Sequence, residues 1–358
     1  MNNPASRKLV LETGEEFYGN AFGSTAEKIS ELVFNTSMAG YQEILSDPSY
    51  TDQTVVMTYP LIGNYGINPD DFECENPSVS GFIVRDYNDL PSNFRAQETM
   101  SETMKRFGIV GITGIDTRKL TRIIREKGTV RSIITDGDRS TEECLGILRN
   151  SKIPHDQVSR VSPREIKTFK ATEERFRIAA IDCGMKENIV RSLNARGITV
   201  IRVPFDTDPL MIEKLEPDGI FISNGPGDPE DAVPVIETVK RLKGKYPIFG
   251  ICLGHQIISL ACGAKTYKLK FGHRGGNHPV KNLLTGKIEI TSQNHSYAVK
   301  EESLAGTGLV VTHINLLDNT VEGIECEKDR IFGVQFHPES APGPNDSGYL
   351  FDKFVALL

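Results

Sequence analysis

A cysteine with a glycine two residues away on each side occurs in the segment Gly250-Ile251-Cys252-Leu253-Gly254. Glycine at both flanking positions lets the backbone turn sharply, which leaves Cys252 at the tip of a turn between a strand and a helix. A sulfur at a helix N-terminus is favoured as thiolate by the partial positive charge there. We therefore predict that Cys252 is a nucleophile, although a cysteine taken alone is more often a small buried hydrophobe.

A thiol nucleophile needs a base, and the base needs a group that orients it. Among the seven histidines, His337 follows an apolar stretch typical of a buried strand and precedes Pro338-Glu339. The proline stiffens the backbone, so the Glu339 carboxylate could reach the far nitrogen of the imidazole. We therefore predict a catalytic triad of Cys252, His337 and Glu339. The alternative is that residues 337–339 are only the end of a strand.

The other histidines fit this role less well. His255 adjoins the nucleophile but enters the helix, so its side chain is expected to point away from the thiol. His273 and His278 have a spacing that could suit a metal, yet no third carboxylate or cysteine ligand is close by in the sequence. A glycine-rich structural loop is the favoured interpretation there, and His295 is expected to line a pocket. We predict no metal site.

The loop Ser-Asn-Gly-Pro-Gly-Asp-Pro at 223–229 follows a predicted strand. Its glycines, Gly225 and Gly227, leave backbone N–H groups that can point at a ligand. One such donor, together with the N–H of Leu253 after the nucleophile, would form an oxyanion hole for a tetrahedral intermediate. A phosphate-binding turn is the weaker alternative, because neither a full G-x-G-x-x-G fingerprint nor a G-K-[ST] ending is present.

These groups need a scaffold, and the sequence from Arg177 onward alternates strands with helices. This alternation predicts an α/β fold: an open, mostly parallel sheet flanked by helices on both faces. Ligands in such sheets bind beyond the carboxyl ends of the strands, where Cys252 lies. After Lys265 the pattern changes to short strands and turns. The predicted strands cover 178–181, 198–203, 219–223 and 246–251, and the predicted helices 188–195, 209–215, 233–242 and 350–357.

Residues 1–150 are expected to form a separate N-terminal domain of mixed α+β type. Thr13-Gly14 separates two strand-like runs and predicts a hairpin, and Asp116 and Gly128 have the residue types that begin and end a helix. The polar, proline-containing stretch 151–176 predicts a linker. The second domain is then 177–358.

Composition is consistent with a cytoplasmic enzyme. The 358 residues suffice for two domains, and 41 basic against 48 acidic side chains give a net charge of −7, which argues against nucleic acid or an anionic membrane as partner. No apolar run approaches the ~20 residues of a membrane span, and the first residues do not resemble a secretory signal. The six cysteines include no C-x-x-C pair, so neither a disulfide framework nor structural zinc is predicted.

Three separated segments, 223–229, 250–256 and 337–339, resemble the class I (triad) glutamine amidotransferases. In the N-terminal half, Phe-Asn-Thr-Ser-Met-Ala-Gly-Tyr-Gln-Glu-Ile-Leu-Ser-Asp-Pro-Ser-Tyr at 34–50 and Ile-Asp-Thr-Arg-Lys-Leu-Thr at 115–121 are similar to the small subunit of carbamoyl-phosphate synthase. The resemblance runs from about residue 8 to the C-terminus. It therefore covers both predicted domains.

The resemblance implies roles for individual residues. Cys252, His337 and Glu339 match the catalytic triad, and the backbones of Gly225 and Leu253 match the oxyanion hole. The chain departs from the family at Ser296, where glycine is usual. The positions implied to bind glutamine are Ser49, Gly225, Gly227, Leu253, Gln256, Asn294, Ser296 and Tyr297.

The resemblance also implies an activity and a partner. The chain would hydrolyse L-glutamine and pass ammonia to the large subunit of carbamoyl-phosphate synthase, in a heterodimer or higher oligomer serving arginine or pyrimidine synthesis. No cofactor is expected in this chain, with ATP and Mg²⁺ only in the partner. The alternatives are a glutaminase for GMP or CTP synthesis, which the N-terminal motifs disfavour, and a non-catalytic assembly protein, which an intact cysteine, histidine and glutamate disfavour.

Overall fold

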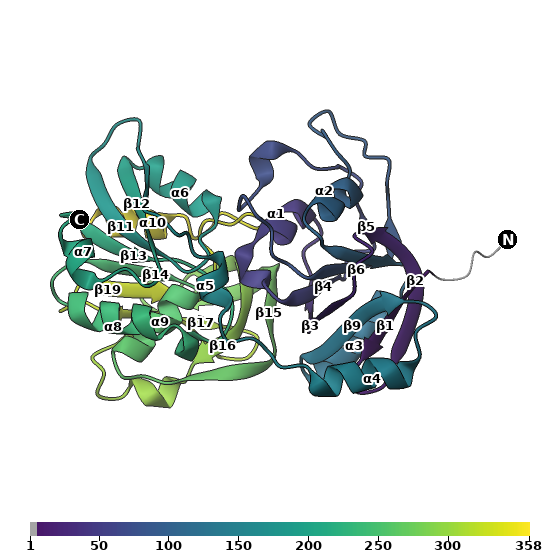
Figure 1. The fold of residues 1–358 in the computed structure, drawn as a ribbon. Helices are drawn as coiled ribbons and strands as arrows, with labels where there is room; N and C mark the ends of the chain where they lie inside the picture. Colours follow the sequence, from purple (N-terminus) through teal and green to yellow (C-terminus); the bar gives the residue numbers. More distant parts are fainter. Residues whose placement is uncertain (1–5) are drawn as a thin grey trace. The chain divides into compact units, whose positions relative to one another are not determined.

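The computed structural model describes residues 6–358. The chain divides into two compact units, Met1–Pro154 and His155–Leu358 (Figure 1). Each unit has its own buried apolar core. The two units are considered separately below.

The first unit is built on a closed barrel of seven strands, in the order β1-β2-β8-β6-β4-β3-β9. The predicted hairpin is confirmed, since β1 and β2 pair antiparallel on either side of Gly14, whose φ is 95°. The predicted capped helix is also confirmed as α3, with the Asp116 carboxylate accepting from Lys119 N at 2.9 Å and Gly128 at its C-cap. The barrel strands are β1 (Arg7–Leu11), β2 (Glu16–Gly23), β3 (Lys28–Asn35), β4 (Gln53–Met57), β6 (Gly81–Val84), β8 (Val110–Thr113) and β9 (Val130–Asp136).

Helices and short strands complete this unit. They are α1 (Tyr41–Ser46), α2 (Met100–Arg106), α3 (Thr117–Lys127), α4 (Thr141–Asn150), the 3-10 turns η1 (Pro48–Tyr50) and η2 (Pro69–Asp71), and the paired strands β5 (Leu61–Ile62) and β7 (Asp86–Tyr87). The mixed α+β expectation did not include a barrel. Closure depends on pairings between strands distant in sequence, such as β3 with β9, and local periodicity carries no information about these.

The second unit contains a ten-stranded sheet whose first half is the predicted parallel core. Strands β12, β11, β13, β14 and β19 are adjacent and parallel in this order. Side chains alternate between two apolar clusters, so that helices cover both faces (Figure 1). The strands are β11 (Phe176–Asp182), β12 (Ile198–Pro204), β13 (Gly219–Ile222), β14 (Ile248–Ile251) and β19 (Ile331–Val334).

Two pairs of helices sandwich this parallel core. α8 and α9 contribute Val235, Val239 and Ile257 to the cluster on one face, and α6 and α10 contribute Ile189 and Phe354 to the other. The helices of the unit are α5 (Gln157–Val161), α6 (Glu187–Asn194), α7 (Pro209–Glu213), α8 (Val233–Leu242), α9 (Leu253–Ala261) and α10 (Tyr349–Val355), with 3-10 turns η3 (Pro229–Asp231) and η4 (Glu301–Leu304).

The description of the sheet as mostly parallel needs correction for its second half. Strands β18, β16, β15 and β17 pair antiparallel, and β17 also pairs with β18. β15 is 17 residues long rather than short, and its glycines and register shifts hide the period-2 pattern by which a strand is recognised. These strands are β15 (Thr266–Asn282), β16 (Ile288–Val299), β17 (Val310–Asn315) and β18 (Val321–Cys326).

The stretch 151–176 also differs from the predicted linker. It contains α5 and the edge strand β10 (Lys167–Phe169), which pairs antiparallel with β12. Val158 of α5 is buried in one of the apolar clusters of the second unit. Polar composition indicated a linker here because an edge strand and a short surface helix bury few side chains.

Candidate active site

The predicted strand–turn–helix around Cys252 is confirmed. β14 ends at Ile251, α9 begins at Leu253, and Cys252 lies between them with φ 54° and ψ −103°. A non-glycine residue in this region is strained, as expected for a nucleophile held at a sharp turn. A Cβ at Gly250 would come within 2.6 Å of the backbone of Gly254, so the turn requires glycine at that position.

His337 and Glu339 lie close together, as the sequence predicted. His337 Nδ1 is 2.7 Å from Glu339 Oε1, and both residues are buried. The loop carrying them follows β19, the strand beside β14, and Cys252 N donates to Val334 O at 2.8 Å. Adjacent parallel strands therefore deliver the thiol and the imidazole to the same edge of the sheet.

The ion pair includes a cation that sequence reasoning missed. Lys186, in the segment between β11 and α6, places Nζ 2.8 Å from Glu339 Oε1. The same ammonium donates to the carbonyl oxygens of Ser340 at 2.7 Å and Ala341 at 3.1 Å. A lysine just after a strand of the parallel core was the available signal, because the carboxyl ends of these strands converge on one edge.

The charges of Lys186, His337 and Glu339 shift the pKa values of both His337 and Glu339. Burial alone would lower the pKa of His337, but the charge of the adjacent Glu339 raises it to about 10. Burial alone would raise the pKa of Glu339, but the charges of Lys186 and His337 lower it to about 2. The structure therefore favours a protonated imidazole facing an ionised carboxylate.

The thiol lies beside this imidazole, although no hydrogen bond of normal geometry joins them. His337 Nε2, on the side of the ring away from Glu339, makes no hydrogen bond. The thiol of Cys252 instead donates to the carbonyl oxygen of Asn294 at 3.5 Å. Contacts between nucleophile and base are often long without substrate and shorten when it binds.

The loop that carries Gly225 packs against Leu253, the other residue predicted to supply an oxyanion donor. Leu253 is the first residue of α9, where N–H groups have no partner within the helix. A Cβ at Gly225 would collide with the carbonyl oxygen of Cys183 and lie 2.9 Å from Leu253 Cδ2. The loop after β13 therefore packs against the first residue of α9, and only a glycine fits at its closest point.

Three residues assigned to glutamine binding, Gln256, Asn294 and Tyr297, lie on the two elements beside the nucleophile. Gln256 Nε2 donates to the Tyr297 carbonyl oxygen at 2.7 Å. Asn294 contacts the thiol of Cys252 through its carbonyl oxygen. All three belong to α9 or β16, which pack against each other beside the turn at Cys252.

Ser296, where the family usually has glycine, is accommodated without backbone strain. Among the described residues, the non-glycine positions with positive φ do not include Ser296. Its Oγ accepts a hydrogen bond from Nη2 of the buried Arg274 at 2.5 Å. The substitution therefore adds a polar contact between β15 and β16.

The other two assigned residues lie elsewhere. Gly227 has φ 89° and faces the Gln157 side chain, to which a Cβ would approach within 3.1 Å. Ser49 belongs to the first unit, where it lies in η1 and its N–H donates to Asp47 Oδ1 at 2.9 Å. Its role in glutamine binding stays a prediction.

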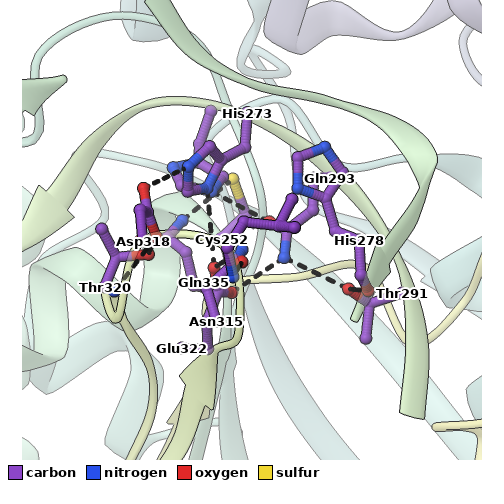
Figure 2. Close-up of polar contacts among 12 residues, drawn as sticks. Cys252, His273, His278, Thr291, Gln293, Asn315, Asp318, Thr320, Glu322 and Gln335 are labelled. Atoms are coloured by element: carbon purple, nitrogen blue, oxygen red, sulfur yellow. Dashed lines mark hydrogen bonds and ion pairs between the residues drawn. The ribbon is translucent and has the colours of Figure 1, made fainter. Parts of the chain in front are cut away.

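Two of the remaining histidines, His273 and His278, lie on β15 at a polar network in the antiparallel half of the sheet (Figure 2). His273 Nε2 is 2.8 Å from Asp318 Oδ2, and His295 Nε2 is 2.9 Å from Gln293 Oε1. His278 contributes a ring 5.1 Å from that of His273. His255 is fully buried in α9, and burial lowers its pKa to about 4.

Part of this network meets the distance criterion for a metal site. Among the described residues, His273, His295 and Glu322 bring potential ligand atoms within 4.8 Å of one another. Both ring nitrogens of His295 already face protein oxygens, those of Gln293 and of the Tyr297 carbonyl. Because these atoms are engaged with protein groups, we assign no metal here.

Comparison with known families matches both halves of the chain. Residues 9–134 match the carbamoyl-phosphate synthase small chain, CPSase domain, and residues 179–357 match the glutamine amidotransferase class-I family. The boundaries fall within the two compact units. No helix in the described part of the chain is long and apolar enough to cross a membrane.

Curated relatives cover nearly the whole chain. The chain is 54% identical over 350 residues to the carbamoyl phosphate synthase small chain of Fusobacterium nucleatum subsp. nucleatum, covering 98% of this chain and 97% of the relative. It is 54% identical over 352 residues to that of Bacillus caldolyticus, with 98% and 96% covered. The carbamoyl phosphate synthase pyrimidine-specific small chain of Halalkalibacterium halodurans is 51% identical, with 98% and 97% covered.

A solved structure is similar over part of the chain. A putative GMP synthase protein from Thermoplasma acidophilum is 22% identical, with a TM-score of 0.44, and the match covers 51% of this chain and 93% of that one.

Proposed function

Because the chain belongs to the family of carbamoyl phosphate synthase small chains, we propose that it hydrolyses glutamine to glutamate and ammonia with Cys252 as the nucleophile. The observation that carries the assignment of residues is the strained turn at Cys252, beside the buried pair of His337 and Glu339. The turn supplies a sulfur at a helix N-terminus. The pair supplies an oriented proton donor and acceptor.

In the first half-reaction, the Cys252 sulfur attacks the side-chain amide carbon of glutamine. The carbonyl oxygen becomes an oxyanion, held by the N–H groups of Gly225 and Leu253. The C–N bond then breaks, and the nitrogen leaves as ammonia with a proton from His337. A γ-glutamyl thioester on Cys252 remains.

In the second half-reaction, water replaces the amine. His337, now neutral, accepts a proton from the water as its oxygen attacks the thioester carbon. The C–S bond breaks, glutamate leaves, and Cys252 and His337 return to their starting forms. Glu339 orients the imidazole and stabilises its charged form throughout, and Lys186 holds Glu339 in its ionised form.

We propose that this chain releases the ammonia and that a separate large subunit uses it, as the name of the family implies. The ammonia passes to a large subunit, which uses ATP, Mg²⁺ and bicarbonate to make carbamoyl phosphate, in the cytoplasm. This chain binds glutamine through residues of the second unit and through Ser49 of the first. Among the curated relatives, one is called pyrimidine-specific, but dedication to arginine or pyrimidine synthesis is not part of our proposal.

The two alternatives have less support. A glutaminase for GMP or CTP synthesis does not account for the match of residues 9–134 to the carbamoyl-phosphate synthase small chain domain. A non-catalytic assembly protein does not account for a buried ion pair of histidine and glutamate beside a strained cysteine.

Glutamate release from glutamine tests the activity and its nucleophile together. Cys252→Ser should abolish hydrolysis, because a hydroxyl is far less ionised than a thiol. Cys262→Ser is the matched control, since Cys262 ends the same helix and should leave hydrolysis intact. A glutamine-mimicking electrophile should label Cys252; labelling at Cys262 or Cys183 instead would contradict the assignment.

A second experiment tests the division of labour. The complex with the large subunit should hydrolyse glutamine faster than the isolated chain. A complex containing Cys252→Ser should make carbamoyl phosphate from added ammonia but not from glutamine. A complex equally inactive with both nitrogen sources would argue against transfer of ammonia between subunits.

A further inference from the structure

A buried glutamine that belongs to none of the roles assigned above contacts the nucleophile. Gln335 follows β19 directly and is fully buried. Its Nε2 lies 3.7 Å from Cys252 Sγ, in a geometry suited to an N–H···S hydrogen bond (Figure 2). An amide removed from water is costly unless its polar atoms are bonded, so this contact with sulfur matters for the position of Gln335.

The neighbouring hydrogen bonds fix which end of the Gln335 amide faces the sulfur. Gln256 Nε2 donates both to the Tyr297 carbonyl oxygen at 2.7 Å and to Gln335 Oε1 at 3.0 Å. Turning the Gln335 amide over would bring its NH₂ group against the NH₂ group of Gln256. The network therefore directs the Gln335 donor, rather than its oxygen, toward Cys252.

The contacts of the sulfur then differ between its two protonation states. As a thiol, Cys252 donates to the Asn294 carbonyl oxygen at 3.5 Å. As a thiolate, it has no proton to donate and can only accept. Hydrogen bonds to an ionised acceptor are roughly twice as strong as neutral ones, so the contact with Gln335 gains strength when the proton leaves.

We propose that Gln335 is a further catalytic residue, whose side-chain amide donates to the Cys252 sulfur and stabilises the thiolate that attacks glutamine. This inference deepens the proposed function and rests on it. Gln256 acts through Gln335 as a positioning residue, in addition to its assigned part in glutamine binding. His337, backed by Glu339 and Lys186, is the titrating group on another side of the same sulfur.

The pH dependence of alkylation tests the proposal without needing glutamine. The rate at which iodoacetamide modifies Cys252 in the full chain, followed by mass spectrometry, reports the thiolate fraction. Gln335→Met has a similar size but no donor. Its pH midpoint should lie about one pH unit above the wild-type value, roughly tenfold less thiolate at a given pH, because a hydrogen bond to a charged group is lost.

Gln293→Met is the matched control. Gln293 is also a buried glutamine, bonded to Glu322 and Thr291 in the adjacent network. Losing its amide should leave the midpoint near the wild-type value. An unchanged midpoint in Gln335→Met, or an equal rise in Gln293→Met, would overturn the proposal.

Folding and the proposed function are checked separately. Thermal unfolding shows whether Gln335→Met is folded. If it is not, Gln335→Leu takes its place, because it also lacks a donor and carries no charge, and the same rise is expected. If iodoacetamide modifies Cys252 in the wild-type chain but the chain releases no glutamate from glutamine, the proposed function is wrong and the role of Gln335 is not. If it hydrolyses glutamine and the variant midpoint does not move, the role of Gln335 fails alone.

Discussion

Two buried histidines of the second unit are each held by a carboxylate, but they differ in what the rest of the ring meets. His337 Nδ1 is 2.7 Å from Glu339, and its Nε2 makes no hydrogen bond. His273 Nε2 is 2.8 Å from Asp318, and its Nδ1 is 3.6 Å from Glu322. One ring therefore has a nitrogen left for proton transfer, and the other has a carboxylate on both sides.

Both histidines have raised pKa values, so ionisation alone does not distinguish them. Burial would lower the pKa of His273, but the hydrogen bond with Asp318 and the charges of Glu322 and Asp318 raise it to about 9. Burial would likewise lower the pKa of His337, but Glu339 above all raises it to about 10. The geometry of the second nitrogen, rather than the pKa, identifies the histidine that can react.

The largest expected difference is in turnover. His337→Asn keeps some hydrogen bonding but cannot transfer protons, so glutamine hydrolysis should fall by about 10² or more. His273→Asn and His278→Asn should reduce it much less, because among the described residues the hydrogen bonds of the Cys252 sulfur are with Asn294 and Gln335. Steady-state glutamate release measures all three, and equal losses would mean that the distinction between the two histidines is wrong.

Of the carboxylates paired with these two histidines, Glu339 should matter more for turnover than Glu322. Glu339→Gln keeps the shape but removes the charge that stabilises the imidazolium, so kcat should fall by roughly tenfold to a hundredfold. Glu322→Gln removes a charge from the other cluster and should affect kcat far less. Measuring kcat of both variants at saturating glutamine tests this. A greater loss of kcat in Glu322→Gln would contradict the different roles assigned to the two histidines.

His273 should matter more for folding stability than for turnover. Replacing it with asparagine leaves the buried Glu322 and the half-exposed Asp318 without their shared cation. The free energy of unfolding should fall by about 1–3 kcal/mol. Urea unfolding of His273→Asn beside wild type measures this loss, and an unchanged unfolding midpoint would remove the structural role assigned to His273.

The pH dependence of that loss follows from the directions of the shifts. The raised pKa of His273, about 9 against an ordinary 6.5, means that its contribution is complete below about pH 6.5 and disappears as pH rises through 9. The lowered pKa of Asp318, about 2 against 3.8, gives a contribution that disappears as pH falls through 2. The stability difference between wild type and His273→Asn should therefore be larger at pH 5.5 than at pH 9. Urea titrations at both values test this, and a difference that grew with pH would have the wrong sign.

The smallest effect is expected at Ser296. Ser296→Gly removes the hydrogen bond to Arg274 without relieving strain, since Ser296 does not have positive φ. The KM for glutamine should change by about fivefold or less, with kcat nearly unchanged. A large drop in kcat would mean that the serine hydroxyl takes part in the reaction, and steady-state kinetics would reveal it.

The sequence predicted best where local chemistry decides the structure. The glycines around Cys252 forced the turn that the structure contains, and Asp116 and Gly128 bounded a helix as expected. The strands of the parallel core were predicted because each is a short apolar run between helices. The meeting of Cys252 with His337 followed from the family motifs and from the position of parallel strand ends.

What escaped prediction depends on contacts between distant segments. The barrel of the first unit closes through pairings such as β1 with β9. Lys186 and Gln335 gain their roles only when their segments meet Glu339 and Cys252, 153 and 83 residues away in the sequence. For Lys186 the sequence offered only its place after a strand of the parallel core, and for Gln335 only its place at a strand end; neither position identifies the distant partner.

The contact of Gly254 with β13 has a consequence for how the active site can vary. A Cβ at Gly254 would collide with the carbonyl oxygen of Ile222, so α9 rests on the main chain of the strand. Ile222 is the last residue of β13, and the loop that carries Gly225 begins directly after it. The spacing between the sulfur and this donor loop is therefore set by one backbone touching another. A single added methyl group at residue 254 would therefore alter that spacing at once.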